Sequence, residues 1–202
     1  PGPVVLDATA STNVLWELLG DRAIVKATPP RTRSYRNVTL HVARDVGVGK
    51  TKMRERGDDR VPRLLKDLED RLGDRSVFLV CHKGIEHVAK TYEPSFASYE
   101  VGHWGAIDGR NDWQEADAAV LFGLPYRDNA WAFNTFFALQ GVQDDAWLEN
   151  PTWRQRENFH LEMQTMQLSS SAIQAINRIR CRRVIDRDGN CPTAYVYIVL
   201  PR

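Results

Sequence analysis

Short apolar runs alternate with amphipathic segments along this chain, a pattern typical of strands that alternate with helices. The predicted strands cover residues 3–9, 23–27, 37–43, 76–82, 95–101, 118–125 and 194–200. The predicted helices cover residues 13–19, 61–73, 129–140 and 152–166, and a further helix is expected after Gly84. This alternation favours an α/β fold, with helices on both faces of a mainly parallel sheet.

The segment from Ser169 to Arg183 stands out because closely spaced arginines follow a short apolar stripe. Its serines can cap a helix, and isoleucines at every third position give that helix one apolar side. Arginine donates two parallel hydrogen bonds and stays charged, so it is well suited to binding phosphate. The segment alone leaves two interpretations open: a phosphate contact, or basic side chains that complement the dipole of a helix end.

Composition narrows the class of protein only slightly. The 202 residues are 43% hydrophobic and 26% charged, with a net charge of +1, so any basic surface must be local. Three cysteines without framework spacing favour a reducing, cytoplasmic compartment. No run is long and apolar enough for a membrane span. Because an apolar run follows Pro1 at once, we expect the chain to be part of a longer polypeptide.

Two motifs of ligand-binding sites are incomplete. Residues 47–51 (GVGKT) resemble the end of a phosphate-binding P-loop, but the first glycine of that pattern falls on Arg44. A basic loop is therefore predicted there, continuing into a polar stretch over residues 52–59. Cys81-His82 lacks a second ligand pair at zinc spacing, so no metal site is predicted.

Four segments, taken in their order along the chain, resemble a known family. They are Leu6-Asp7-Ala8-Thr9, Val80–Gly84, Asp108-Gly109-Arg110-Asn111 and Gln174…Arg178. In this order they resemble motifs III, IV, V and VI of the second, C-terminal RecA-like domain of superfamily 2 DNA helicases, of the bacterial, phage or primase-associated type. The resemblance covers essentially the whole chain. It implies one three-layer RecA-like (P-loop NTPase-type) α/β domain over residues 1–202, with residues 1–20 a candidate for the end of a preceding RecA-like domain.

In such helicases ATP and Mg²⁺ are bound mainly by the first RecA-like domain, which this chain does not contain. The resemblance therefore implies that the chain alone is inactive and that it supplies arginines to the ATP site. Arg178 would be the first candidate for the arginine finger and Arg180 the second. Gln174 would position the water or the γ-phosphate. The residues expected to line the nucleotide cleft are Asp108, Gly109 and Asn111.

The same resemblance implies contacts to single-stranded or forked DNA. The expected strand-contacting residues are Lys83, Gly84, Thr91, His103 and Trp104. Asp7 and Thr9 of the motif III-like segment would couple the state of the nucleotide to binding of the strand.

The chain departs from the family pattern at several positions. Asn177 replaces the motif VI glycine and Cys181 the second arginine, so that either Arg180 or Arg182 would have to serve instead. Asp108 and Asn111 stand where motif V usually has Glu and Asp. These departures keep a second function open: a non-catalytic α/β module that binds nucleic acid or a partner in replication.

Overall fold

The computed structural model divides into two compact units. It describes residues 4–5, 9–10, 13–29, 32–44, 47–154 and 157–200. Unit 1 consists of Pro1–Thr28 and Tyr126–Ile173, and unit 2 consists of Pro29–Pro125 and Gln174–Arg202. Unit 2 is therefore assembled from two stretches of chain, between which most of unit 1 is inserted.

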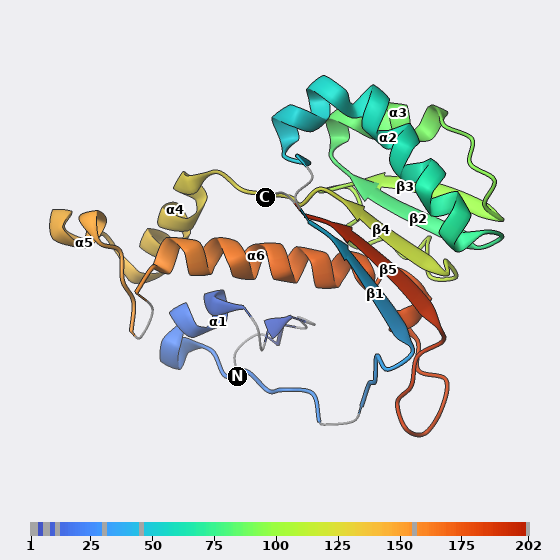
Figure 1. Cartoon of the computed structure of the whole chain (residues 1–202). Coiled ribbons are helices and arrows are strands. Elements are labelled where there is room, and N and C mark those ends of the chain that lie inside the picture. Colours follow the sequence, from blue (N-terminus) through green and yellow to red (C-terminus); the bar gives the residue numbers. More distant parts are fainter. Residues whose placement is uncertain are drawn as a thin grey trace. The chain divides into compact units, whose positions relative to one another are not determined.

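Unit 2 is built on a sheet of five parallel strands in the order β1-β5-β4-β2-β3 (Figure 1). Their bounds are Val38–Ala43 for β1, Ser76–Cys81 for β2, Ser98–His103 for β3, Ala118–Phe122 for β4 and Ala194–Val199 for β5. The three-layer α/β class with a parallel sheet is confirmed. β2 and β4 lie inside the sheet and are buried almost throughout, which explains their continuous apolar sequences.

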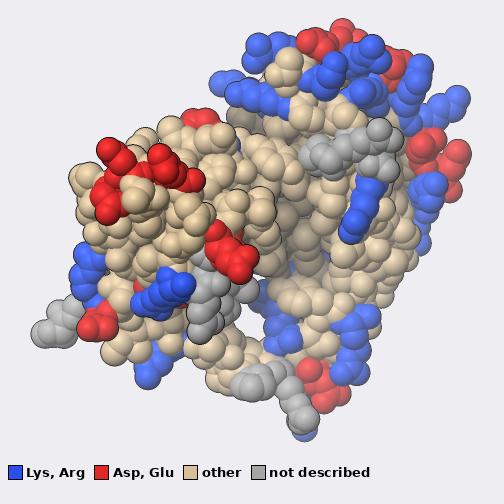
Figure 2. Space-filling view, turned by 60° about the vertical axis from the view of Figure 1, so that its left-hand side comes forward, with Lys and Arg blue, Asp and Glu red and all other residues tan. Residues whose placement is uncertain are grey.

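The longest helix of unit 2 is α2, Lys50–Leu72, which begins eleven residues before the predicted helix. The prediction of a loop and a polar stretch over residues 47–59 was therefore wrong from Lys50 onward. The inner side of this first part is formed by Met53 and Gly57, and a buried glycine adds nothing to an apolar pattern. Basic side chains with acidic ones among them crowd the surface over α2 (Figure 2).

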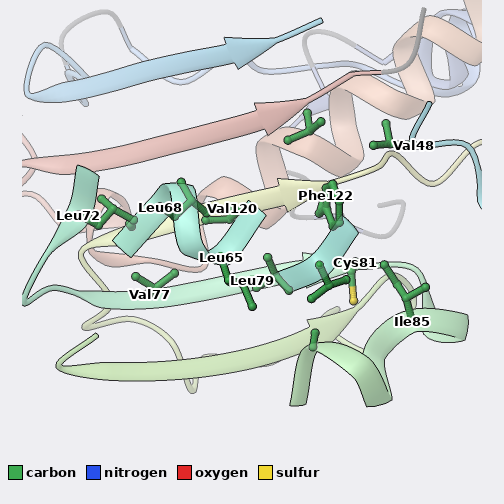
Figure 3. Close-up of a cluster of buried hydrophobic side chains, with 14 of the residues drawn as sticks. Val48, Leu65, Leu68, Leu72, Val77, Leu79, Cys81, Ile85, Val120 and Phe122 are labelled. Atoms are coloured by element: carbon green, nitrogen blue, oxygen red, sulfur yellow. The ribbon is translucent and has the colours of Figure 1, made fainter. Parts of the chain in front are cut away.

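α2 and the short helix α3, Glu86–Thr91, cover one face of the sheet. Leu65, Leu68 and Leu72 of α2 pack against the strand residues Val77 and Val120 in the core of unit 2 (Figure 3). Gly57 allows a close approach here, because a Cβ atom at this position would lie 2.5 Å from Cγ2 of Ile85. Close packing of this kind fixes α2 on the sheet.

The opposite side of β2 is covered by the connection between β3 and β4, which contains no helix. Trp113 of this connection stacks on Phe78 of β2, with 4.0 Å between the ring centroids. Ile107 is also buried, and its Cγ2 would lie 2.7 Å from a Cβ atom placed on Gly102 of β3. The connection thus runs from the end of β3 to the start of β4 over a packed surface.

Unit 1 is helical in the residues that the structure describes. Its helices are α1 (Val14–Leu18), the 3-10 turn η2 (Gly20–Arg22), α4 (Asn129–Gln140), α5 (Asp145–Glu149) and α6 (Phe159–Ile176), the last of which extends into unit 2. α4 has the predicted bounds, and its aromatic residues belong to a core cluster as expected. Within the described part of the chain, no helix is long and apolar enough to cross a bilayer.

Two predicted strands of unit 1 are wrong in the residues that can be assessed. Val4 and Val5 are 88% and 61% exposed and form no strand, although most of the run 3–9 lies outside the described residues. Residues 23–27 are not a strand either, and Ile24 is 81% exposed. A short apolar run resembles a buried strand in sequence, but it is buried only where it joins a sheet whose faces other elements cover.

The predicted helix start at Ser169–Ser171 is also wrong, because these serines lie inside α6. α6 ends at Ile176, and a 3-10 turn, η4 (Arg180–Arg182), follows after Asn177–Ile179. The arginines therefore lie on an irregular segment before β5 and not on one helical face.

Candidate functional site

The arginine segment, residues 178–183, is bonded to the end of the β3–β4 connection, residues 110–117. An Nη of Arg178 donates to the backbone carbonyl of Arg110 at 2.7 Å, and Arg182 donates to the side-chain oxygen of Asn111. Arg183 pairs with Glu115 at 2.8 Å. The structure thus brings together two of the segments that resemble helicase motifs, at the amino edge of the sheet, where β4 begins.

Asp117, just before β4, is the centre of this contact. Its carboxylate accepts hydrogen bonds from the backbone N–H and the hydroxyl of Ser76, at 2.9 and 2.7 Å, and it forms an ion pair with Arg180. Partial burial acts to raise the pKa of Asp117, but the bonds from Ser76 and the charge of Arg180 outweigh it and hold the pKa below its usual range. Arg180 therefore fastens the arginine segment to β2 and β4.

The arginines differ in the charge of their partners. Arg180 and Arg183 are paired with carboxylates, whereas Arg178 and Arg182 bond to neutral oxygen atoms. Nε of Arg178 is shielded from solvent and has no hydrogen-bond partner among the described residues. Among the described residues neither Arg178 nor Arg182 forms an ion pair, so both guanidinium groups are candidates for binding a phosphate.

Three further residues predicted for the ATP site are exposed: Asp108, Gly109 and Gln174. Asp108 and Gly109 form a turn in which Gly109 has a φ of +74°, a conformation that glycine adopts without strain. Gln174 lies in the last turn of α6. The amide oxygen of Asn177 accepts hydrogen bonds from Tyr35 at 2.7 Å and from Arg33 at 3.3 Å, which gives this replacement of the motif glycine a structural role.

Most of the predicted strand-contacting residues lie at the carboxyl edge of the sheet. Lys83 and Gly84 form an exposed 3-10 turn, η3 (Lys83–Ile85), after β2. His103 ends β3, and the indole N–H of Trp104 donates to the carbonyl of Gly123 at 3.0 Å. Thr91 lies apart from them, at the far end of α3.

An acidic residue that the sequence did not single out organises this second cluster. Glu86 contacts Nδ1 of His103 at 2.7 Å and the ammonium group of Lys90 at 2.8 Å. Partial burial acts to raise the pKa of Glu86, but these two partners hold it below its usual range. Neither residue belongs to a motif: Glu86 begins α3 after the turn that follows β2, and Asp117 immediately precedes β4.

The predicted site is therefore divided between two edges of one sheet. Because all strands are parallel, the start of β4 and the end of β3 lie at opposite edges. A strand of five or six residues separates these edges by about 17–20 Å. Of the motif III-like pair, Asp7 lies outside the described residues, and Thr9 is buried in unit 1.

The described residues contain no group of three His, Cys, Asp or Glu side chains placed to hold a metal ion. All three cysteines are buried and free. Burial raises the pKa of Cys81 to about 12 and that of Cys181 to about 11, so both remain neutral thiols near neutral pH.

Comparison of the chain with protein-family models, curated proteins and solved structures finds no match in any of the three.

Proposed function

We propose that this chain is the second RecA-like motor domain of an ATP-dependent helicase or translocase that acts on a nucleic-acid strand, DNA in the first instance. The observation that carries the proposal is the bonding of residues 178–182 to residues 110–111. Two segments that resemble motifs V and VI meet there, and in the described part of the chain Arg178 and Arg182 bond to neutral oxygen atoms and not to carboxylates.

In this proposal ATP and Mg²⁺ are held mainly by a preceding domain, and this chain contributes cations to the γ-phosphate. Arg178 is the arginine finger, because among the described residues its guanidinium bonds to the backbone carbonyl of Arg110 and, unlike Arg180 and Arg183, forms no ion pair. Such a finger neutralises charge that develops during phosphoryl transfer, an effect worth roughly 10³–10⁵ in rate. Arg182 is a better candidate than Arg180 for the second arginine, since Arg180 is already paired with Asp117.

The remaining predicted residues have supporting roles in the proposal. Gln174 positions the attacking water, and the exposed turn at Asp108 and Gly109, together with Asn111, lines the cleft. Lys83 at the carboxyl edge contacts the phosphates of the strand, and Trp104, whose indole N–H is bonded to Gly123, contacts the strand through its ring. Closure of the two motor domains on ATP and their opening after hydrolysis would move the chain along that strand.

The test is made in the polypeptide that contains the preceding domain. Arg178→Ala should reduce the DNA-stimulated kcat for ATP hydrolysis by roughly 10³-fold or more while ATP binding is retained. Arg183→Ala is the matched control, because it removes an arginine of the same segment that pairs with the exposed Glu115. Normal turnover of the Arg178 variant, or efficient ATP hydrolysis by the 202-residue chain alone, would overturn the proposal.

One observation favours the second function, a non-catalytic module that binds nucleic acid or a partner. Each arginine at positions 178, 180, 182 and 183 already has a hydrogen-bond partner within unit 2. If these bonds only fasten the β3–β4 connection, the longer polypeptide will bind a strand but show no ATPase activity, and Arg178→Ala will change stability alone.

A further inference from the structure

A polar hollow of about 700 Å³ lies at the amino edge of unit 2, where the chain enters β1 and β5. It is lined by Arg33, Ser34, Arg36, Arg187 and Asp188. These residues come from two segments far apart in sequence, and none of them belongs to the arginine segment described above. No motif in the sequence pointed to this hollow.

The backbone fixes the walls of the hollow. Ser34 donates its N–H to the carbonyl of Gly189 at 2.7 Å and accepts from the N–H of Cys191 at 3.3 Å. The turn that follows Asp186 is held by its carboxylate, which accepts from the N–H groups of Asp188 and Asn190, both at 3.0 Å. The hollow is thus part of the folded frame around the starts of β1 and β5.

The charge of Arg36 helps to lower the pKa of the nearby Asp186, but the hydrogen bonds of the hollow's arginines go to uncharged groups. Arg33 donates to Tyr35 and Asn177, and Nε of Arg36 donates to the hydroxyl of Ser34 at 3.3 Å. Within the described part of the chain, no carboxylate forms an ion pair with either of them or with Arg187, in contrast to Arg180.

The balance of charge around the hollow remains positive but small. Three arginines face two carboxylates, those of Asp188 and the nearby Asp186, which leaves a formal charge of +1. In Figure 2, basic side chains with a smaller acidic group lie at the lower end of unit 2.

The residues that line the hollow also determine which chemical groups of a ligand it can bind. Guanidinium groups bind phosphate oxygens through paired hydrogen bonds. None of the described lining residues is apolar or aromatic, and the exposed Tyr35 beside the hollow is held through its hydroxyl by Asn177. We propose that this hollow binds the phosphodiester backbone of a single nucleic-acid strand without reading its bases. The inference rests on the part of the proposed function that gives the chain a nucleic-acid partner, and it is independent of ATP turnover.

The contact with Asn177 connects the hollow to the arginine segment. Arg33 and Tyr35 both bond to the amide oxygen of Asn177, which immediately precedes Arg178. The hollow therefore lies next to the arginine segment and at the opposite edge of the sheet from Lys83 and Trp104, so its contacts to a strand would be additional to those proposed at the carboxyl edge.

The test is binding of a fluorescent single-stranded oligothymidylate to the 202-residue chain, followed by anisotropy between about 50 and 200 mM salt. Arg36→Ala combined with Arg187→Ala should weaken binding roughly tenfold at low salt, and it should reduce the slope of log K against log salt by about 1.4, or 0.7 for each lost contact. Both side chains are exposed, so the double variant should fold; Arg33 is spared because it holds Asn177.

The matched control is Lys26→Ala with Arg127→Ala, which removes two exposed charges from unit 1. It should change affinity less than twofold, and Arg36→Lys with Arg187→Lys should recover most of the binding. The inference would be overturned if the two double alanine variants lost the same affinity for the oligonucleotide, or if the variant of the hollow lost none. Either result would leave the proposed function standing. Absence of binding by the unaltered chain would overturn both, and stronger binding of pyrophosphate than of the oligonucleotide would replace the strand with a small phosphate.

Discussion

Replacing Asp117 with asparagine should loosen the arginine segment from the sheet. The carboxylate accepts two hydrogen bonds from Ser76 and one ion-paired bond from Arg180, and the two charged side chains are 24% and 31% exposed. An amide of the same size has only one oxygen, so its NH₂ group must face one of these donors. A net loss of about 2–3 kcal/mol in the free energy of unfolding follows from one charged and one neutral bond.

This loss of stability should be measurable both in the unfolding of the whole chain and in the two segments that Asp117 joins. For a chain of this length each kcal/mol shifts the unfolding midpoint by about 2–4 °C, so Asp117→Asn should lower it by roughly 4–12 °C. Hydrogen exchange should accelerate in residues 105–117 and 178–183 before it does elsewhere in unit 2. A double-mutant cycle with Arg180→Gln should give a coupling energy of about 1–2 kcal/mol.

The control for this prediction is Glu115→Gln, which breaks an ion pair in the same two segments. Glu115 is 67% exposed in its pair with Arg183, and exposed ion pairs contribute about 0–1 kcal/mol to the free energy of unfolding. If Asp117→Asn proves as stable as Glu115→Gln, or if the cycle shows no coupling, then Asp117 does not fasten the segment and the reasoning is refuted.

Three further predictions concern packing, thiols and pH. Gly57→Ala should destabilise unit 2 by about 1 kcal/mol, because the clash with Ile85 outweighs the helix-forming advantage of alanine. Gly84→Ala is the control, since a Cβ atom there would meet open space, and unfolding in denaturant measures both variants. All three cysteines should resist alkylation at neutral pH until urea unfolds the chain, since they are buried and burial raises the pKa of Cys181 to about 11; rapid labelling of the native protein, seen by mass spectrometry, would contradict this. The pKa of Glu86 is lower in the folded than in the unfolded state, so its contribution is complete above about pH 4.3 and is lost as pH falls through the folded value; the stability difference between wild type and Glu86→Gln should therefore shrink in acid.

The sequence predicts the buried part of the sheet well. Residues 76–82 and 118–125 were predicted as strands because both faces of β2 and β4 are covered and their sequences are apolar throughout. The sequence fails where burial depends on a glycine, as at Gly57 in α2, or where an apolar run stays exposed, as at Ile24. At Gly57 the residue that requires a glycine is Ile85, which lies far away along the chain.

The candidate site is predicted in its parts but not in its arrangement. Residue order alone brought residues 108–111 and 174–178 into one hypothesis, and the structure joins Arg178 to Arg110. Nothing in the sequence pairs Arg180 with Asp117, because that pairing depends on where β4 begins. The hollow around Arg33 and Arg187 was missed for a related reason: only parallel pairing of β1 with β5 brings those segments together.

The position of β5 has a consequence for how the chain folds during synthesis. Of the five strands in this sheet β5 leaves the ribosome last, yet it lies between β1 and β4 and is the strand with which β1 pairs. Until residues 194–199 emerge, β1 has no strand to pair with among those described. About 150 residues are synthesised between the two paired strands. A protein truncated just before Ala194 would therefore lose β5 and leave β1 without the strand it pairs with, although β1 is the earliest of the five strands in the sequence.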